Sequence, residues 1–344
     1  MNHEMSHETI STHTDFQQWL QQTQGVAAVA PADTTQAWAT PLNDLGMLEA
    51  SGADALSFLQ GQLTNDLTAL PATQAQLTAY CTAKGRMLAI FITWKTADTV
   101  RLMLPQELQA SIQKRLSMFV LRAKVKLNGV TESSLILGLG GAAAGKLLEL
   151  SFGSLPQTDY GMAHSPAGTL IRLPHPNQSP CWLLVTEEVA ALQFVQQHAT
   201  QLTWVASSYW YWNQIQAGIP HIVASTQEQF VPQMVNWDVI GGVSFSKGCY
   251  PGQEIVARSH YLGKLKRRMA LAHVEATAPA PGTDIFHNNE PCGKVVNAAP
   301  HPVRGWDILV ELPIEIQAQG DVRLGSAIGA VLEFLPLPYV IPNK

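Results

Sequence analysis

The pattern of apolar residues changes near Arg268, and this change constrains the fold more than any other feature of the chain. Before Arg268, apolar residues at helical spacing, such as Leu108, Ile112 and Leu116, alternate with β-rich runs. After Arg268 the helical signal fades, and short β-rich runs alternate with Pro and Gly turns. The sequence therefore predicts an α+β fold that ends in a small β-barrel.

A chain of 344 residues is longer than a single hydrophobic core usually supports, so several packed units are expected. The predicted parts are a flexible N-terminal tail at 1–35, an α+β domain at 36–130, a second α+β domain at 131–265 and the barrel at 266–344. The runs expected as strands include 45–50, 77–81, 87–94, 134–140 and 182–186, and those expected as helices include 15–22, 105–119 and 187–198.

Composition and charge narrow the class of protein. Hydrophobic residues make up 46% of the chain and charged residues 14%, which is typical of a compact globular protein. The net charge of -5 offers no general basic surface for nucleic acid or anionic membranes. The four cysteines are dispersed, and we interpret His3, His7 and His13 as a solvated terminus, so no metal site is predicted. Neither a secretory signal nor a long apolar run is visible, which favours a cytoplasmic protein without a membrane segment.

One basic segment offers most of the chemistry that the residues themselves suggest. Residues 247–268 hold six basic residues against the single acid Glu254, so a local positive field is expected. Glycines in this segment permit sharp turns that let backbone amides approach a ligand. Cations near Cys249 favour its reactive thiolate, and a buried structural cysteine is the alternative. Gln253 and Glu254 either hydrogen-bond the edge of a heterocycle or cap a following helix.

The same segment resembles the signature of a known family. Residues 247–254 read KGCYPGQE, and residues 256–258 and 263–267 continue as VAR and GKLKR. Together they resemble the signature of the YgfZ family of folate-binding, tRNA-modifying proteins, which is related to the glycine-cleavage T-protein. The likeness extends to residues 60–66, 81–87, Trp210 with 217–220, and 230–233 with Asn236.

The resemblance implies a T-protein-like multidomain fold in which tetrahydrofolate is held in a central opening, partly by the N-terminal domain at 36–130. It places Trp210 against the folate, and the alternative is that this tryptophan and its aromatic neighbours belong to the core. Leu45 stands where the family has a second folate-contacting tryptophan, and Gln216 stands where relatives often have Glu.

The implied site residues come from the signature and from a predicted hairpin. Cys249 is the candidate reactive thiol, and the residues expected to bind the folate are Trp210, Leu45, Lys247, Gln253, Glu254, Arg258, Lys84 and Arg86. Lys84 and Arg86 flank the hairpin glycine, where they are expected to meet a folate glutamate tail or an RNA phosphate. An exposed charged turn is the alternative for this pair.

The function that the resemblance implies is a folate-binding accessory protein for iron–sulfur enzymes, including those that thiomethylate tRNA, through transient or indirect contacts. The alternatives are a folate-dependent one-carbon transferase for an unidentified substrate and an RNA-binding module that uses the basic run. Aminomethyl transfer is not expected, because residues 87–91 hold no carboxylate where the T-protein has its essential Asp. Catalysis and direct tRNA binding stay open at this point.

Overall fold

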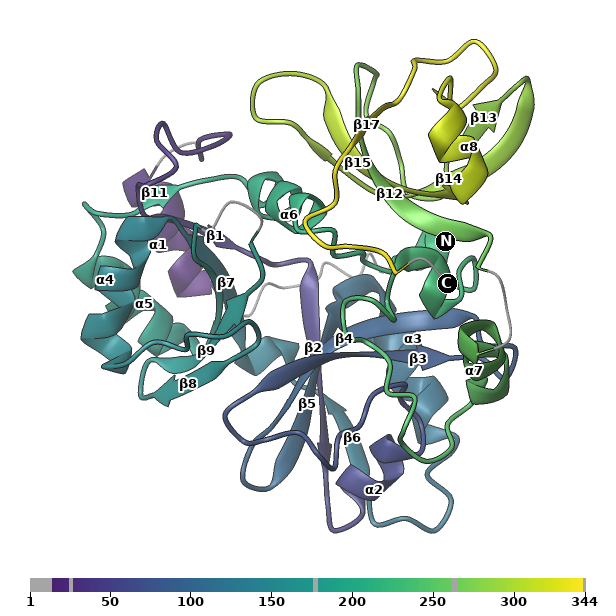
Figure 1. Ribbon diagram of the computed structural model, residues 1–344. Coiled ribbons are helices and arrows are strands. Elements are labelled where there is room, and N and C mark those ends of the chain that lie inside the picture. Colours follow the sequence, from purple (N-terminus) through teal and green to yellow (C-terminus); the bar gives the residue numbers. More distant parts are fainter. Residues whose placement is uncertain (1–13, 25–26, 176–178, 262–264, 343–344) are drawn as a thin grey trace, which may run out of the picture.

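The computed structural model describes residues 14–24, 27–175, 179–261 and 265–342. Three antiparallel or mixed sheets, each with its own helices, are arranged around α6 near the centre of the molecule (Figure 1). The mixture of helices and strands confirms the predicted α+β class. Most of the expected N-terminal tail, including its three histidines, lies outside the described residues, as do Gly263 and Lys264 of the basic run.

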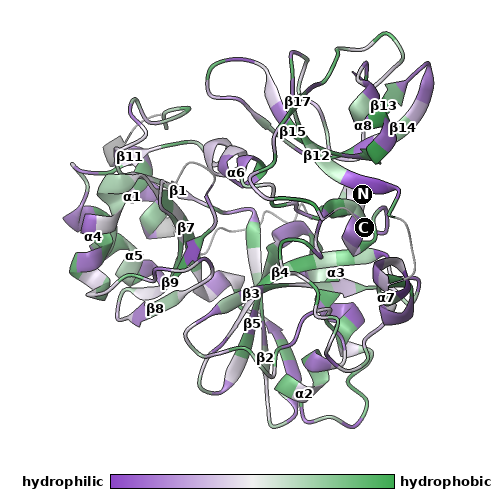
Figure 2. Ribbon diagram, viewed as in Figure 1, coloured by the Kyte–Doolittle hydropathy of each residue, from purple (hydrophilic) through white to green (hydrophobic). Residues whose placement is uncertain are grey.

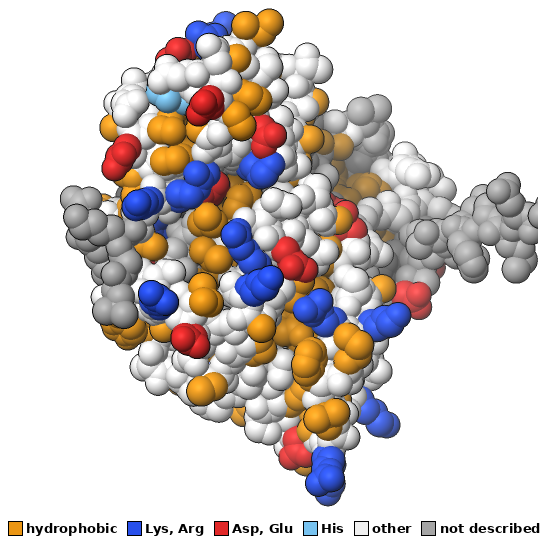
Figure 3. All heavy atoms as spheres, turned by 90° about the vertical axis from the view of Figure 1, so that its right-hand side faces the viewer, with side chains coloured by type: hydrophobic (Ala, Val, Ile, Leu, Met, Phe, Trp, Pro, Cys, Tyr) orange, Lys and Arg blue, Asp and Glu red, His pale blue; other side chains and the backbone are white. Residues whose placement is uncertain are grey.

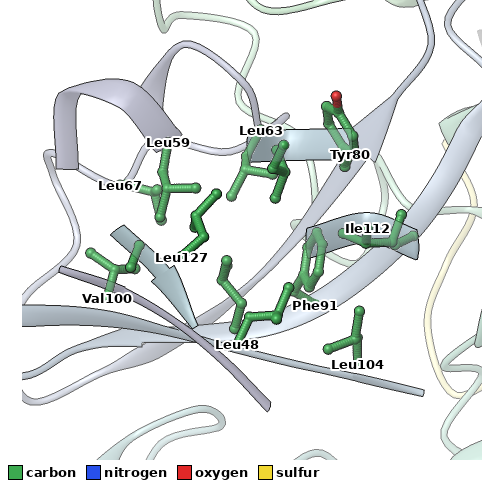
Figure 4. Packing of buried hydrophobic residues seen from close by; sticks show 14 of the residues in the cluster. Leu48, Leu59, Leu63, Leu67, Tyr80, Phe91, Val100, Leu104, Ile112 and Leu127 are labelled. Atoms are coloured by element: carbon green, nitrogen blue, oxygen red, sulfur yellow. The ribbon is translucent and has the colours of Figure 1, made fainter. Parts of the chain in front are cut away.

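The first sheet is built by the segment between residues 45 and 129. Its strands, in spatial order, are β3 (Ala75–Cys81), β4 (Met87–Lys95), β5 (Thr99–Pro105), β2 (Leu45–Ser51) and β6 (Lys126–Gly129). One face is covered by α2 (Ala55–Gln60) and α3 (Gln106–Ser117). Figure 4 shows the core between them, where Leu48, Phe91 and Ile112 meet, and each of these side chains is at most 1% exposed.

The second sheet combines an early strand with the middle of the chain. Its strands, in order, are β11 (Thr203–Trp204), β1 (Trp38–Pro41), β7 (Leu135–Gly140), β10 (Cys181–Thr186), β9 (Gly168–Leu173) and β8 (Met162–Ser165). The helices α1 (Thr14–Gln24), α4 (Ala142–Phe152) and α5 (Glu188–Gln197) belong to this unit, and η1 (Thr131–Ser133) leads into it. The predicted boundary at residue 36 is therefore wrong for β1, which pairs with β7 rather than with the first sheet.

The helix α1 corrects the prediction of a flexible tail. Phe16 is 0% exposed and belongs to the core of the second sheet. Its ring lies edge-on to Trp204 with centroids 6.2 Å apart, and its backbone nitrogen donates to Glu188 Oε1 at 2.9 Å. The helix is held because its apolar side fills this core, which the polar composition of the surrounding segment conceals.

The third sheet is a curled antiparallel sheet of the kind predicted for the C-terminal barrel (Figure 1). Its strands, in order, are β16 (Arg323–Leu324), β13 (Asp284–His287), β14 (Glu290–Pro300), β15 (Trp306–Pro313), β12 (Arg267–Val274) and β17 (Glu333–Leu335), and α8 (Ile314–Gln319) packs beside them. Figure 2 shows apolar residues on the central strands of the molecule and hydrophilic ones on the outer helix α7.

The segment between the second and third sheets joins all three units. It contains α6 (Ser207–Gln216), η2 (Ala224–Thr226), η3 (Pro232–Val235) and α7 (Gln253–Tyr261). Ile215, Phe230 and Val235 pack in one core with Leu77 of the first sheet and Leu271 of the third. Tyr209 and Trp210 of α6 pack on the second sheet, so this connector contacts all three sheets, and the predicted boundary at residue 265 falls after it, just before β12 begins at Arg267.

Candidate functional site

The signature segment, residues 247–254, is anchored by a buried lysine. The ammonium of Lys247 donates to the backbone oxygens of Gln60 at 2.5 Å, Leu63 at 2.6 Å and Asn65 at 3.2 Å. Burial lowers the pKa of Lys247 to about 8, and nearby Asp66 acts in the opposite direction. An ammonium has three hydrogens, so these carbonyls use its full donor capacity. Lys247 thus holds the loop after α2, and it has no donor left for a ligand in this conformation.

The turn at Gly252 seats the signature against the β3–β4 hairpin. Gly252 has a φ of 81°. A Cβ atom there would lie 2.5 Å from the Thr82 oxygen and 2.6 Å from the backbone nitrogen of Gly85, so only glycine fits. Tyr250 is buried beside this turn, and the Lys247 nitrogen lies 5.3 Å from the centre of its ring. The predicted hairpin and the signature are therefore one structural unit.

The side chains that this unit presents to solvent include the candidate thiol. Cys249 is exposed, as are Glu254, Arg258 and Lys84. The face that carries α7 displays Lys and Arg side chains together with Asp and Glu side chains, scattered among hydrophobic ones (Figure 3). Cys249 therefore lies in an open setting, and the alternative of a buried structural cysteine is wrong.

Two other predicted ligands of this unit have structural partners. Gln253 Nε2 donates to the Lys247 oxygen at 3.3 Å, and Arg86 Nη1 donates to the Gln229 oxygen at 2.6 Å. Arg86 thereby ties the hairpin to the connector. Lys84 is the more accessible of the two hairpin cations.

A large cavity lies elsewhere, near α6. Its volume is about 800 Å³, and it is lined by Asn43, Asp44, Pro105, Gln106, Glu107, Tyr211, Ile215, His221, Val223, Pro281, Asn297 and Ala298. The Tyr211 hydroxyl donates to the Asp44 carboxylate, and burial together with this carboxylate raises the pKa of Tyr211. Glu107 Oε1 accepts a hydrogen bond from the Ala224 backbone nitrogen at 2.8 Å. We call this space the central cavity.

A smaller inner cavity of about 20 Å³ shares Pro105 and His221 with the central cavity, and its walls include Leu45, Trp210, Gln214 and Trp237. The structure thus brings the two residues aligned with folate-contacting tryptophans, Leu45 and Trp210, to one cavity. Trp210 is 0% exposed, and a Cβ atom at Gly138 would lie 2.4 Å from its Cδ1 atom. Trp210 therefore belongs to the hydrophobic core and also lines the inner cavity. Its ring has no face open to the central cavity.

The predicted site residues fall into two groups that the structure keeps apart. None of residues 247–254 is among the lining residues of the central or the inner cavity. Figure 1 shows α7 at one edge of the molecule and α6 near its centre. The candidate thiol Cys249 and the folate-contact candidate Trp210, which the resemblance places in one site, therefore do not line a common cavity.

Sequence reasoning missed most residues of the central cavity. Tyr211 was considered only as a core neighbour of Trp210, and Asp44, Glu107, His221 and Asn297 were not singled out. A usable signal was present, because Asp44 directly precedes Leu45 and His221 directly follows residues 217–220, which carry the family resemblance.

Two absences hold for the described part of the chain. It contains no group of three or more His, Cys, Asp or Glu side chains placed to hold a metal ion. Among its helices, none combines the length and the apolar character needed to cross a membrane.

Comparison with known proteins adds sequence relatives and a structural neighbour. No family model matches the chain. The tRNA-modifying protein YgfZ of Yersinia enterocolitica serotype O:8 / biotype 1B is 33% identical over 306 residues, which cover 87% of this chain and 91% of the relative. The tRNA-modifying protein YgfZ of Pectobacterium atrosepticum is 30% identical over 329 residues, or 92% of this chain and 96% of the relative.

The structural neighbour supports the predicted fold. The glycine cleavage system aminomethyltransferase T from Bartonella henselae matches with a TM-score of 0.71 at 16% identity, covering 89% of this chain and 88% of that one. At this identity the match concerns the fold alone, and it confirms the prediction of a T-protein-like architecture. The sequence relatives cover nearly the whole chain, and on their evidence the chain belongs to the YgfZ family of tRNA-modifying proteins.

Proposed function

We propose that this protein binds tetrahydrofolate in the central cavity and acts as an accessory protein in tRNA modification, supporting iron–sulfur enzymes that thiomethylate tRNA. The name of its relatives supports the tRNA part of the proposal. The central cavity is the single observation that carries the folate part. Its volume of about 800 Å³ lies within the range of about 300–1,000 Å³ that is usual for sites of small ligands.

The lining of the central cavity suits a reduced pterin. Tyr211 and His221 provide aromatic surface, while Pro105 and Ile215 provide aliphatic surface. The carboxylates of Asp44 and Glu107 are acceptors, and a pterin presents paired N–H donors along one edge. A carboxylate partly removed from water gains more from such a pair than it does at the surface.

Binding of tetrahydrofolate by the purified protein tests the folate part. Calorimetry without oxygen is expected to show saturable binding to the wild type. Asp44→Asn and Tyr211→Leu are expected to raise the dissociation constant by about tenfold or more, because each removes a group from the lining. Thr169→Ala, in a separate polar cleft lined by Arg101 and Ser134, is the matched control and should bind as the wild type does. A wild type that binds no folate at millimolar concentration contradicts the proposal.

The accessory role centres on Cys249, which is the exposed thiol of the signature segment. In a strain that lacks this protein, Cys249→Ala is expected to leave the level of thiomethylated tRNA nucleosides low, as measured by mass spectrometry of tRNA hydrolysates. Cys292→Ala, in the third sheet, is the control and should restore the level. Full restoration by Cys249→Ala would remove this cysteine from the proposal.

Aminomethyl transfer is not part of the proposed function. Residues 87–91 lie in β4, and all five side chains are apolar and at most 5% exposed. This stretch supplies no carboxylate to orient and deprotonate a substrate amine.

A further inference from the structure

The inner cavity contains buried polar groups that the protein itself leaves without partners. His221 Nε2 and Gln214 Nε2 are buried and have no hydrogen-bond partner among the residues that the structure describes. Gln214 is 2% exposed and sits on α6, while His221 belongs to the walls of both cavities. A buried polar group without a partner costs about 1–3 kcal/mol, so each such group calls for an explanation, and a bound molecule that completes the bonding is one.

The two tryptophans of the inner cavity are a different case. Trp210 Nε1 and Trp237 Nε1 also lack partners in the described part of the chain. A Cβ atom at Gly242 would lie 2.2 Å from Trp237 Nε1, and one at Gly138 would lie 3.0 Å from Trp210 Nε1. Both indole N–H edges are therefore covered by glycine backbone. His221 and Gln214 remain as the groups that a guest in the inner cavity can satisfy.

The polarity of this pair defines what fits. An amide nitrogen is a donor only, and a neutral imidazole donates from one of its two nitrogens. Burial lowers the pKa of His221 to about 4, so the ring is neutral near pH 7. With its hydrogen on Nε2, His221 is a second donor beside Gln214 in the lining of the same cavity, and two donors call for an acceptor. The inner volume of about 20 Å³ exceeds the roughly 10–15 Å³ needed by one water molecule and excludes a ring.

We propose that His221 and Gln214 form a specificity pocket for a single carbonyl oxygen of the ligand in the central cavity, which for a pterin is its 4-oxo group. This inference rests on the proposed folate binding and deepens it. Pro105 and His221 line both cavities, and in this proposal a ring in the central cavity extends one exocyclic atom past them while the ring itself stays outside. The pocket then determines which edge of the ring points inward. The carboxylates of Asp44 and Glu107, in the lining of the central cavity, face the remaining N–H groups of the ring.

A matched pair of ligands tests the pocket. Folic acid carries the 4-oxo acceptor and a hydrogen on the adjacent N3, whereas aminopterin carries a 4-amino donor and an N3 without hydrogen, so the variants at His221 and Gln214 are needed to assign the difference to the pocket. Two donors that face an amino group leave buried groups unpaired, so wild type is expected to bind folic acid about 10- to 100-fold more tightly than aminopterin. His221→Phe and Gln214→Met are expected to lower this ratio toward one, mainly by weakening folic acid.

Two further variants separate recognition from folding. His221→Gln places an amide nitrogen near the position of Nε2 and is expected to recover at least part of the ratio. His198→Phe is the control, because His198 is 2% exposed with an Nε2 that also lacks a partner in the described chain, yet it packs against Phe194 of α5. His198→Phe should keep the wild-type ratio.

Three outcomes overturn the inference, and they differ in what else they affect. Equal affinity of wild type for both compounds, or a ratio unchanged by His221→Phe and Gln214→Met, removes the pocket and leaves folate binding intact. If neither folic acid, nor aminopterin, nor tetrahydrofolate binds at millimolar concentration, both the pocket and the proposed function are removed.

Discussion

A Cβ atom at Gly252 would lie 2.6 Å from the backbone nitrogen of Gly85, so the signature segment and the β3–β4 hairpin meet backbone to backbone. Both glycines have positive φ angles, 81° and 71°. Two stretches of sequence that resemble the family separately are thereby parts of one surface. Lys84 stands on the hairpin side of this contact and Cys249 on the signature side.

This contact predicts a large effect of adding one methyl group. Gly252→Ala is expected to lower the free energy of unfolding by about 2–4 kcal/mol, because the left-handed backbone and the collision with Thr82 and Gly85 both oppose it. Gly241 has a φ of 82° and no atom within 4 Å of an added Cβ, so Gly241→Ala isolates the backbone term, at about 1–2 kcal/mol. Urea unfolding measures the free energy of unfolding of both variants. An equal loss in the two variants would contradict the close contact at Gly252.

The role of Lys247 as an anchor also predicts a stability effect. Lys247→Met is expected to cost about 2–4 kcal/mol, because the carbonyls of Gln60, Leu63 and Asn65 lose their donor inside the protein. Lys84→Met removes an exposed lysine and should change stability by less than about 0.5 kcal/mol. Thermal and urea unfolding of the two variants decide the matter. A stable Lys247→Met protein with impaired folate binding would instead favour the ligand role predicted from the sequence.

Burial of His221 predicts a pH dependence of stability. Its pKa is about 4 in the folded protein and about 6.5 when unfolded, so the unfolded chain binds more protons between these values. Stability from this residue is therefore complete above pH 6.5 and falls as the pH is lowered toward 4. Between pH 7 and 5 the loss is about 2 kcal/mol, at about 1.4 kcal/mol per pH unit below 6.5. In urea unfolding, the free energy of unfolding of His221→Gln should fall by about 2 kcal/mol less than that of the wild type between pH 7 and pH 5. The same pH dependence in both proteins would contradict the prediction.

The departure at Gln216 has a structural explanation that can be tested. Gln216 Nε2 and Trp212 Nε1 each donate to Asp307 Oδ2 at 2.7 Å, which ties α6 to β15. Glu at position 216 would face this buried carboxylate with a second one. Gln216→Glu is therefore expected to cost about 1–3 kcal/mol at pH 7.

The loss in Gln216→Glu should shrink at lower pH. The introduced carboxyl would have a raised pKa in the folded state, so the folded protein binds the extra proton and stability is regained as the pH falls toward 5. Gln196→Glu, on the exposed side of α5, is the control and should show neither the loss nor the recovery. Unfolding curves at pH 7 and pH 5 provide the measurement. A loss that persists unchanged at pH 5 would argue against charge repulsion.

Local pattern was enough to predict the class of fold and several of its elements. The hairpin of β3 and β4 and the helix α3 follow directly from apolar spacing and the glycine turn, because these signals depend on neighbours in the sequence. The strands β8 and β9 were not foreseen: β8 has four residues and only two apolar ones, whereas β9 carries Leu170, Ile171 and Leu173 and was overlooked despite them. Residues 247–254 also pointed to the family on their own, which the relatives confirm.

Only the tertiary structure decided where those residues lie and what they contact. The donors of Lys247 meet carbonyls 182 to 187 positions away, and the central cavity collects side chains from Asn43 to Ala298. Such contacts depend on how three sheets pack around α6, and no periodicity within one segment encodes them. For the same reason the sequence placed Cys249 and Trp210 in one site, whereas packing puts the thiol on an open loop and the indole in the core.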